Sequence, residues 1–98
     1  MLYIVRFTDK PAALSLRKEW LPAHLSWLDE HQESVLVAGS LRHDIAKVAI
    51  GGLWIVEASS REAVEELVST DPFWTQGLRE GYEIHHWSKA FPERKVLV

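Results

Sequence analysis

His24 is the residue whose type and position in this sequence are best suited to acid–base chemistry. The pattern of apolar residues predicts a helix over residues 14–31. A rotation of about 100° per residue places His24 in the middle of the apolar face, flanked by Trp20 and Trp27. An imidazole shielded from water by two indoles has a proton affinity that depends on its neighbours. His24 is therefore a candidate catalytic base, and a buried structural histidine is the alternative.

Asp71 is the carboxylate best placed to serve as a partner for His24. It opens the segment Asp71-Pro72-Phe73-Trp74, between a predicted helix and a short turn. In the expected fold both helices cover the same sheet face, so part of one helix can approach the end of the other. A carboxylate beside an imidazole orients the ring and fixes its tautomer, which suits general acid–base catalysis near neutral pH. A helix N-cap is the alternative role for Asp71.

Two further polar residues are candidates for contacts with a ligand. Arg17 lies seven residues before His24 and hence on the same helix face, where it can pair with a carboxylate or receive an anionic substrate. Ser40 follows Gly39 at the end of a predicted strand, where its hydroxyl can hydrogen-bond a ligand. An ordinary ion-paired arginine and an ordinary strand-end serine are the alternatives.

The residue types that usually bind metals or phosphate are not arranged for either role. His85 and His86 are expected on opposite faces of a strand, and His24 and His31 are about 10 Å apart along a helix. The chain has no cysteine, and Gly51-Gly52 is too short to form a glycine-rich phosphate loop. We therefore expect neither a metal site nor a cofactor.

The composition predicts one domain spanning residues 1–98 and argues against two classes of partner. A chain of 98 residues has no room for a second core. The formal net charge is −3 and no basic cluster exceeds the pair Arg17-Lys18, which argues against nucleic-acid binding. No apolar run approaches about 20 residues and no signal-peptide pattern opens the chain, so we expect no membrane span and a cytoplasmic location. Five tryptophans favour an interface or a ligand pocket.

Alternating and helical apolar patterns predict the element order βαββαβ. Strands are expected over residues 2–7, 35–41, 50–58 and 82–87. A second helix should begin at a capping box formed by Ser59 and Glu62 and stop near Asp71, while Pro22 should kink or divide the first. This order is typical of the ferredoxin-like α+β fold, an antiparallel four-stranded sheet with both helices on one face.

The second face of that sheet is expected to be apolar and uncovered. Alternate strand residues would form it, namely Tyr3, Val5, Leu53, Ile55 and Trp87. An exposed apolar face of this size indicates a partner, and a homodimer with its sheets packed face to face is the simplest one. The tail, residues 90–98, carries apolar Val96, Leu97 and Val98 and would be able to cross the other subunit.

Several short motifs, in the expected order, resemble the YciI-like (YCII) family over nearly the whole chain. They are Met1-Leu2-Tyr3-Ile4-Val5, Pro22-Ala23-His24-Leu25, Val37-Ala38-Gly39-Ser40-Leu41, Asp71-Pro72-Phe73, Gly77-Leu78 and Trp87. The resemblance implies a dimeric ferredoxin-like α/β-barrel related to muconolactone isomerase, with the family's paired histidine and aspartate at His24 and Asp71. This chain departs from the commoner pattern in having Ser40 instead of proline and a short segment between Leu41 and Gly51, which affects the pocket and therefore the substrate.

The residues and the resemblance together predict a cofactor-independent acid–base enzyme for a small cyclic or aromatic substrate. One branch of the family is a dehydrochlorinase that eliminates HCl from 5-chloro-2-hydroxyhydroquinone, and such a flat hydroxylated ring stacks well on indoles. The expected substrate contacts are Trp20, Trp27, Phe73 and Trp74 in the pocket wall, with Ser40 and Arg17 as polar groups. An isomerase similar to muconolactone isomerase and a non-catalytic dimer that binds a small molecule are the alternatives.

Overall fold

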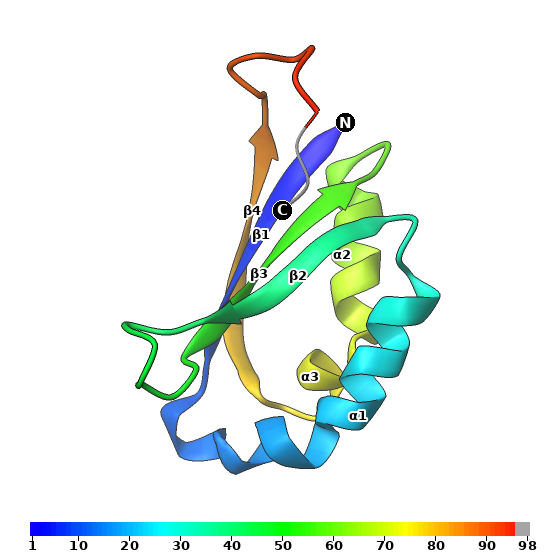
Figure 1. Ribbon diagram of the computed structural model, residues 1–98. Coiled ribbons are helices and arrows are strands. Elements are labelled where there is room, and N and C mark those ends of the chain that lie inside the picture. The colour runs from blue at the N-terminus through cyan, green and yellow to red at the C-terminus, as the bar shows by residue number, and fades with distance from the viewer. Residues whose placement is uncertain (96–98) are drawn as a thin grey trace.

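A four-stranded antiparallel sheet carries the helices on one side in the computed structural model, which describes residues 1–95 (Figure 1). Along the chain the elements are β1 (Leu2–Asp9), a 3-10 helix (Pro11–Ala13), α1 (Ser15–Glu30), β2 (Val35–Leu41), β3 (Gly51–Glu57), α2 (Arg61–Thr70), α3 (Pro72–Thr75) and β4 (Arg79–Trp87). The strands lie in the order β2-β3-β1-β4. The predicted ferredoxin-like α+β fold is therefore confirmed.

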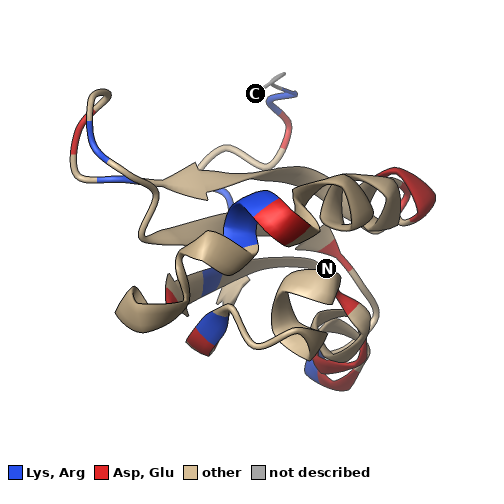
Figure 2. Cartoon of the chain, turned by 90° about the horizontal axis from the view of Figure 1, so that it is seen from below, with Lys and Arg blue, Asp and Glu red and all other residues tan. Residues whose placement is uncertain are grey.

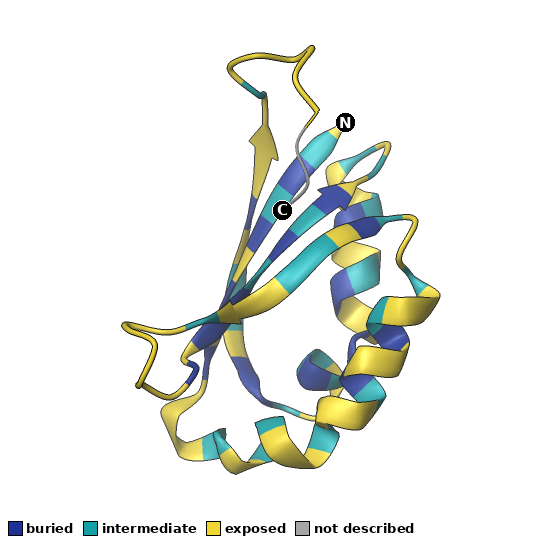
Figure 3. Ribbon diagram, in the orientation of Figure 1, coloured by how far each residue is buried: buried dark blue, intermediate teal, exposed yellow. Residues whose placement is uncertain are grey.

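The core lies between the sheet and the helices, and β1 supplies its centre. Tyr3, Val5 and Phe7 are buried on the helix-facing side, because successive side chains of a strand point to opposite faces (Figure 3). The prediction that Tyr3 and Val5 belong to the uncovered face was wrong. Alternation separates two faces along a strand, but only the packing of the helices decides which of them is covered.

The uncovered face is made by the alternate residues of the same strands. Ile4 pairs with Ile55, and Leu2 pairs with both Glu57 and Trp87. Leu53 and Ile55 therefore lie on this face, as predicted. The half-buried or partly exposed apolar residues of the uncovered face are Leu2, Ile4, Val37, Leu53, Ile55 and Trp87.

Helix α1 runs without a break through Pro22, so of the two expectations for this proline, a kink or a division of the helix, the division was wrong. Proline lacks the N–H that would bond to the carbonyl one turn earlier. Pro22 is exposed, so water can solvate the carbonyl that loses its partner. Neighbouring backbone bonds and the packing of α1 are sufficient to keep the helix whole.

The start of α2 lies one residue later than predicted. Ser60 is the N-cap, and its side chain accepts a hydrogen bond from the backbone N–H of Ala63. The proposed capping box at Ser59 was therefore wrong in register. The helix ends at Thr70, and Asp71 caps α3 with Pro72 at its first position, as the sequence predicted.

Strands β1 and β4 are both longer than their apolar patterns predicted. The alternation of β1 continues to a buried Asp9, and β4 begins at Arg79, which pairs with Asp9 across the sheet. Lysines and arginines are otherwise scattered in short segments over the described chain (Figure 2). None of the helices in residues 1–95 is long and apolar enough to cross a membrane. The predicted apolar tail residues Val96, Leu97 and Val98 lie outside the described residues.

Candidate active site

His24 and Asp71 form a buried hydrogen-bonded pair. The Nδ1 of His24 lies 2.6 Å from the Oδ1 of Asp71, and the two residues are 7% and 0% exposed. His24 comes from the middle of α1, whereas Asp71 stands at the junction of α2 and α3. The same Oδ1 accepts the backbone N–H of Phe73 at 3.2 Å, so Asp71 is at once the partner of His24 and the N-cap of α3.

This pairing determines which nitrogen of His24 is free. A carboxylate accepts the hydrogen bond, so Nδ1 carries a proton, and this N–H donates a hydrogen bond to Asp71. In the neutral ring, Nε2 therefore holds the lone pair, and no hydrogen-bond partner for it is present among residues 1–95. His24 also lines a cavity between α1 and the sheet. Nε2 is thus available to take a proton from a bound molecule and return it.

The ring of His24 stacks on Phe73, not on the tryptophans of its own helix. The two ring centroids are 3.9 Å apart and the planes differ by 13°. The prediction that Trp20 and Trp27 flank His24 was wrong, because α3 packs against α1 and inserts Phe73 beside the imidazole. Trp27 instead stacks on Trp54 in the core, with its indole N–H donated to the hydroxyl of Thr70 at 3.0 Å.

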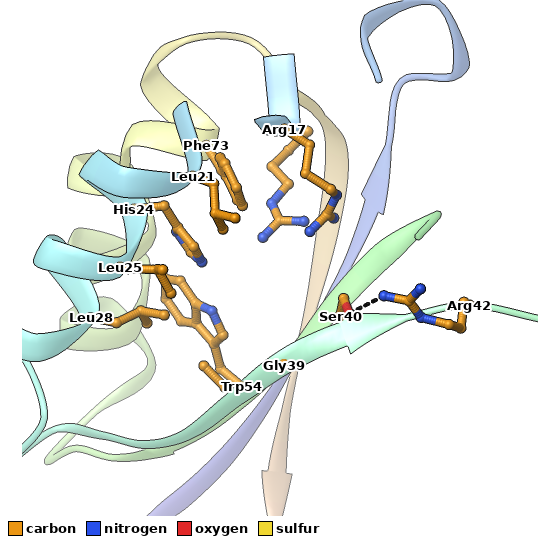
Figure 4. Close-up of a pocket in the computed structure, with 12 residues that line it drawn as sticks. Arg17, Leu21, His24, Leu25, Leu28, Gly39, Ser40, Arg42, Trp54 and Phe73 are labelled. Carbon is orange, nitrogen blue, oxygen red and sulfur yellow. Dashed lines mark hydrogen bonds between the residues drawn. The ribbon is translucent and has the colours of Figure 1, made fainter. Parts of the chain in front are cut away.

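The cavity beside His24 has a volume of about 250 Å³ (Figure 4). A cavity of about 150 Å³ is sufficient to hold benzene, so this one has room for a single substituted ring. Apolar side chains of α1 form one wall, and strands β2 and β3 form the opposite wall. The lining residues are Arg17, Leu21, His24, Leu25, Leu28, Ala38, Gly39, Ser40, Arg42, Trp54, Phe73 and Arg79.

Of the aromatic residues predicted to wall the pocket, only Phe73 lines this cavity. Trp74 packs edge-on against Tyr82, and Trp20 is half-buried outside the cavity. Trp54 takes their place, and the sequence reasoning missed it. Its alternation with Val56 on β3 marked it as a residue of the helix-facing sheet side, which was the available signal.

Two arginines and one aspartate form a buried cluster at the cavity. Asp9 accepts a hydrogen bond from Arg17 through Oδ2 and another from Arg79 through Oδ1, the latter at 2.7 Å. Arg17 also donates to the carbonyl of Gly51 at 3.2 Å. Burial lowers the pKa of Arg79, while the hydrogen bond to Asp9 opposes that shift, and a guanidinium stays protonated at neutral pH. The cavity therefore has a cationic side.

Arg17 was predicted to face the site, whereas Asp9 and Arg79 were missed. Asp9 was left outside the predicted first strand, residues 2–7, although it continues the inward-facing series of Phe7 on β1. Arg79 precedes the predicted last strand, and only its pairing with Asp9 across the sheet brings it to the cavity. The inward alternation of β1 was the signal for Asp9. Arg79 had no such signal, because a register shift just before Asp9 places Arg79 opposite that residue and out of the alternation of β4.

Ser40 lines the cavity at the end of β2, where the sequence placed it. Its hydroxyl accepts a hydrogen bond from the Nη2 of Arg42 at 2.8 Å, the bond drawn in Figure 4. Arg42 also donates to the carbonyl of Lys47 at 3.1 Å. Both residues are exposed at the mouth of the cavity, so Ser40 can offer a polar contact to a ligand that enters there.

Within residues 1–95, no group of three histidine or carboxylate side chains is gathered tightly enough to hold a metal ion. His85 and His86 lie on opposite faces of β4, since they pair with Ile4 and Tyr3 of β1 respectively. What the site offers is therefore a base on one side, aromatic and aliphatic walls, and cations on another side. That arrangement can move a proton on a small ring held against Phe73 and Trp54.

Comparison with known proteins identifies a family model, the YCII-related domain, which matches residues 1–88. The structure is similar to 5-chloro-2-hydroxyhydroquinone dehydrochlorinase from Burkholderia phenoliruptrix AC1100, solved in complex with 2,5-dihydroxybenzoquinone. The two share 27% sequence identity over 90% of this chain and 94% of that chain, with a TM-score of 0.81. No curated protein sequence matches the chain significantly.

More distant structures share the fold alone. A putative antibiotic biosynthesis monooxygenase from Bacteroides thetaiotaomicron is 17% identical over 99% of this chain and 95% of that chain, with a TM-score of 0.58. SnoaB, a cofactor-independent oxygenase from Streptomyces nogalater, is 12% identical over 94% of this chain and 96% of that chain, with a TM-score of 0.54. The arrangement of strands and helices is thus shared well beyond the residues of the site.

Proposed function

This chain belongs to the YCII-related domain family, and on that premise we propose that it is a cofactor-independent acid–base enzyme for a small cyclic or aromatic substrate. The observation that carries the proposal is the buried His24–Asp71 pair. His24 lines a cavity of about 250 Å³, and its Nε2 is free. A base, its orienting carboxylate and a space for one ring are the parts that a proton-transfer reaction needs.

The most concrete reaction is the elimination of HCl from a chlorinated hydroxyhydroquinone. The similar dehydrochlorinase from Burkholderia phenoliruptrix supports this choice, because its bound 2,5-dihydroxybenzoquinone is a single hydroxylated ring. A ring of that size matches the cavity here, and Trp54 and Phe73 supply aromatic surface against which it can lie. The substrate class therefore follows from cavity size, wall chemistry and similarity together.

The reaction moves protons and chloride without any net oxidation or reduction. Nε2 of His24 takes a proton from a phenolic oxygen, and the ring electrons then accept that proton at the carbon that bears chlorine. This carbon becomes tetrahedral, its bond to chlorine breaks, and chloride leaves with the bonding pair while a second phenolic hydroxyl gives up its proton to water. The product is a hydroxyquinone, and His24 returns to its starting state. Because only protons are transferred, no cofactor takes part in the scheme.

Asp71 holds the imidazole and stabilises its protonated form during the transfer. The short Nδ1–Oδ1 hydrogen bond fixes the ring plane, and Phe73 supports the ring from one face. General acid–base assistance of this kind contributes about 10²–10⁴-fold to a rate. That range is sufficient for a substrate whose hydroxyl groups already activate the ring.

The direct test is anaerobic chloride release from 5-chloro-2-hydroxyhydroquinone. Wild-type protein is compared with His24→Asn, which keeps a polar side chain of similar reach but cannot act as a base. His31→Asn is the matched control, because His31 lies on the same helix and hydrogen-bonds the carbonyl of Trp27 away from the cavity. We expect chloride release by the wild type and the control, and loss of about 10²-fold or more in His24→Asn.

Equal background rates for all three proteins would overturn the dehydrochlorinase proposal. Exchange of a carbon-bound proton with solvent deuterium in a small lactone, dependent on His24, would then favour the isomerase alternative. Binding of a small aromatic molecule that survives His24→Asn, with no product, would favour a non-catalytic role. Folding of each variant is checked by circular dichroism before the assay.

We also propose that the protein is a homodimer formed through the uncovered sheet face. Leu2, Ile4 and Ile55 lie on that face without a helix above them, and Trp87 at its edge is 40% exposed. Apolar side chains on an uncovered face favour association with a self-complementary surface. A second copy brings an identical apolar face, so sheet-to-sheet packing buries both at once.

A further inference from the structure

We propose that Arg17 and Arg79 form a subsite for one anionic oxygen of the substrate, so that the enzyme takes its substrate as a ring-bearing monoanion. The ligand class is a phenolate or an enolate carried on a single ring. This inference rests on the proposed function and specifies which ionised form of the substrate that site accepts.

The cationic side of the cavity consists of two guanidinium groups that hydrogen-bond one shared carboxylate. Arg17 and Arg79 share one carboxylate, and each oxygen of Asp9 is already used by one of them. Asp9 has a fully buried side chain, and Arg79 has a side chain only 2% exposed. Burial lowers the pKa of Arg79, and the charge of Asp71, the second carboxylate nearby, opposes that shift, but Asp71 is hydrogen-bonded to His24 and accepts no hydrogen bond from either guanidinium.

A buried guanidinium is costly when some of its N–H groups have no hydrogen-bond acceptor. Removing a guanidinium from water carries a penalty of several kcal/mol, which a close anion with good hydrogen bonds offsets. Among residues 1–95, Arg17 Nη1 and Arg79 Nη2 have no hydrogen-bond acceptor, and both residues line the cavity. A negatively charged ligand oxygen would accept charge-assisted hydrogen bonds from these groups.

The two guanidinium groups are held in place before any ligand arrives. Arg79 lies over the ring of Phe7 at 4.4 Å and over that of Phe73 at 5.0 Å, measured from its central carbon. Arg17 lies 5.2 Å from the ring centre of Phe73. Phe73 also stacks on His24, so one aromatic ring fixes the base and both cations around the same space. Donors oriented in advance bind an anion without the cost of ordering them.

An anionic oxygen also suits the chemistry of the proposed elimination. The substrate enters with one hydroxyl ionised, and its oxygen lies against the arginines. His24 takes the proton of a second hydroxyl and returns it to the chlorine-bearing carbon, after which chloride leaves. The monoanion thereby becomes a neutral hydroxyquinone plus chloride, and His24 ends in its starting protonation state. The negative charge moves from oxygen to chloride, so the charge balances.

The test measures binding and does not depend on turnover. Isothermal titration gives Kd for 2,5-dihydroxybenzoquinone, at a pH between the pKa values of its two acidic hydroxyls where it is a monoanion, and for its neutral dimethyl ether. The variants are Arg17→Met and Arg17→Lys, since Arg17 is the more exposed arginine and Arg79 remains to pair with Asp9. Lys18→Met is the matched control, because it removes the same charge from the neighbouring helical position outside this cavity.

We expect the wild type to bind the anion at least about tenfold more tightly than the diether. Arg17→Met should weaken anion binding about 10–100-fold, the range for hydrogen bonds to charged groups, and change diether binding less than about threefold. Arg17→Lys should recover part of the loss, and Lys18→Met should leave both affinities unchanged. Equal loss for both ligands, or no loss for the anion, would overturn the subsite. If Arg17→Met does not fold, equal wild-type affinities for the two ligands overturn it instead.

The failure of this inference is distinguishable from failure of the proposed function. Anion-selective binding that depends on Arg17, without chloride release, would support the anion subsite and contradict the proposed dehydrochlorination. Chloride release that depends on His24, with Kd for the anion unaffected by Arg17→Met, would support the proposed dehydrochlorination and contradict the anion subsite.

Discussion

The imidazole of His24 lies flat against the phenyl ring of Phe73, with the ring centroids 3.9 Å apart. Asp71, two residues before Phe73, holds the same imidazole through Nδ1. One short stretch of chain therefore supplies both the hydrogen-bond acceptor and the stacking surface for the candidate base. Its conformation is set locally, because Asp71 caps α3 and Pro72 occupies the first helical position.

Replacing Asp71 with asparagine should reduce turnover with little effect on folding. Asparagine is as good an N-cap as aspartate, so the start of α3 is retained. Its neutral side chain no longer stabilises a protonated imidazole, and its amide can donate to Nδ1 and reverse the tautomer. We expect kcat to fall about 10²–10⁴-fold, measured by chloride release. Asp71→Ala, which also loses the cap, should in addition lower the free energy of unfolding by about 1 kcal/mol or more. Unchanged kcat in Asp71→Asn would contradict the orienting role.

Replacing Phe73 with leucine should weaken both the fold and the site. Phe73 is 1% exposed, and the change removes its stacking on His24 and its contacts with two guanidinium groups. We expect the free energy of unfolding in urea to fall by about 1–3 kcal/mol. Phe91→Leu is the control, because Phe91 also carries an arginine over its ring but is half exposed. It should change stability by less than about 1 kcal/mol, and equal losses in the two variants would argue against a special role for Phe73.

Substituting alanine at Gly51 should destabilise the sheet, whereas the same change at Gly39 should not. A Cβ at Gly51 would overlap the backbone carbonyl of Phe7, which no side-chain rotation relieves. A Cβ at Gly39 would meet nothing within 4 Å. We expect Gly51→Ala to cost about 1–3 kcal/mol of unfolding free energy, and Gly39→Ala to stay within about 1 kcal/mol of the wild type. Thermal and urea unfolding of both variants provide the comparison.

Placing a charge on the uncovered sheet face should dissociate the proposed homodimer. Ile55 lies on that face opposite Ile4, so Ile55→Asp would bury an unpaired carboxylate in a sheet-to-sheet interface. Sedimentation velocity should find the wild type as a dimer and Ile55→Asp as a monomer. Ser26→Asp adds the same charge on the exposed side of α1 and should remain dimeric. A monomeric wild type would contradict the proposed homodimer.

Much of the fold is predictable because its signals are local. Alternation marks the strands, and the cap at Asp71 with Pro72 marks the end of α2 and the start of α3. The end of β1 was predicted too early because a polar residue, Asp9, continues the buried pattern of the strand. An apolar pattern cannot detect a charged residue whose burial depends on an ion pair from a distant segment.

The side chains that surround His24 were harder to predict than His24 and Asp71 themselves. His24 and Asp71 could be selected because one stands on an apolar helix face and the other at a helix start. Which aromatic ring lies beside His24 depends on how α3 packs on α1, and this rotated Phe73 into the position assigned to Trp20 and Trp27. Side-chain packing between elements decides how a helix is rotated about its axis. The spacing of residues along the chain therefore does not predict this rotation.

The sequence by itself determined the order of elements, the caps around Asp71 and the choice of His24 as the candidate base, because these depend on neighbouring residues along the chain. Tertiary structure alone decided that Arg79 meets Asp9, 70 residues away in sequence, and that Trp54 lines the cavity. The physical reason is strand register: a buried ion pair or pocket wall forms only when non-adjacent strands align, and alignment is set by the packing of the whole sheet.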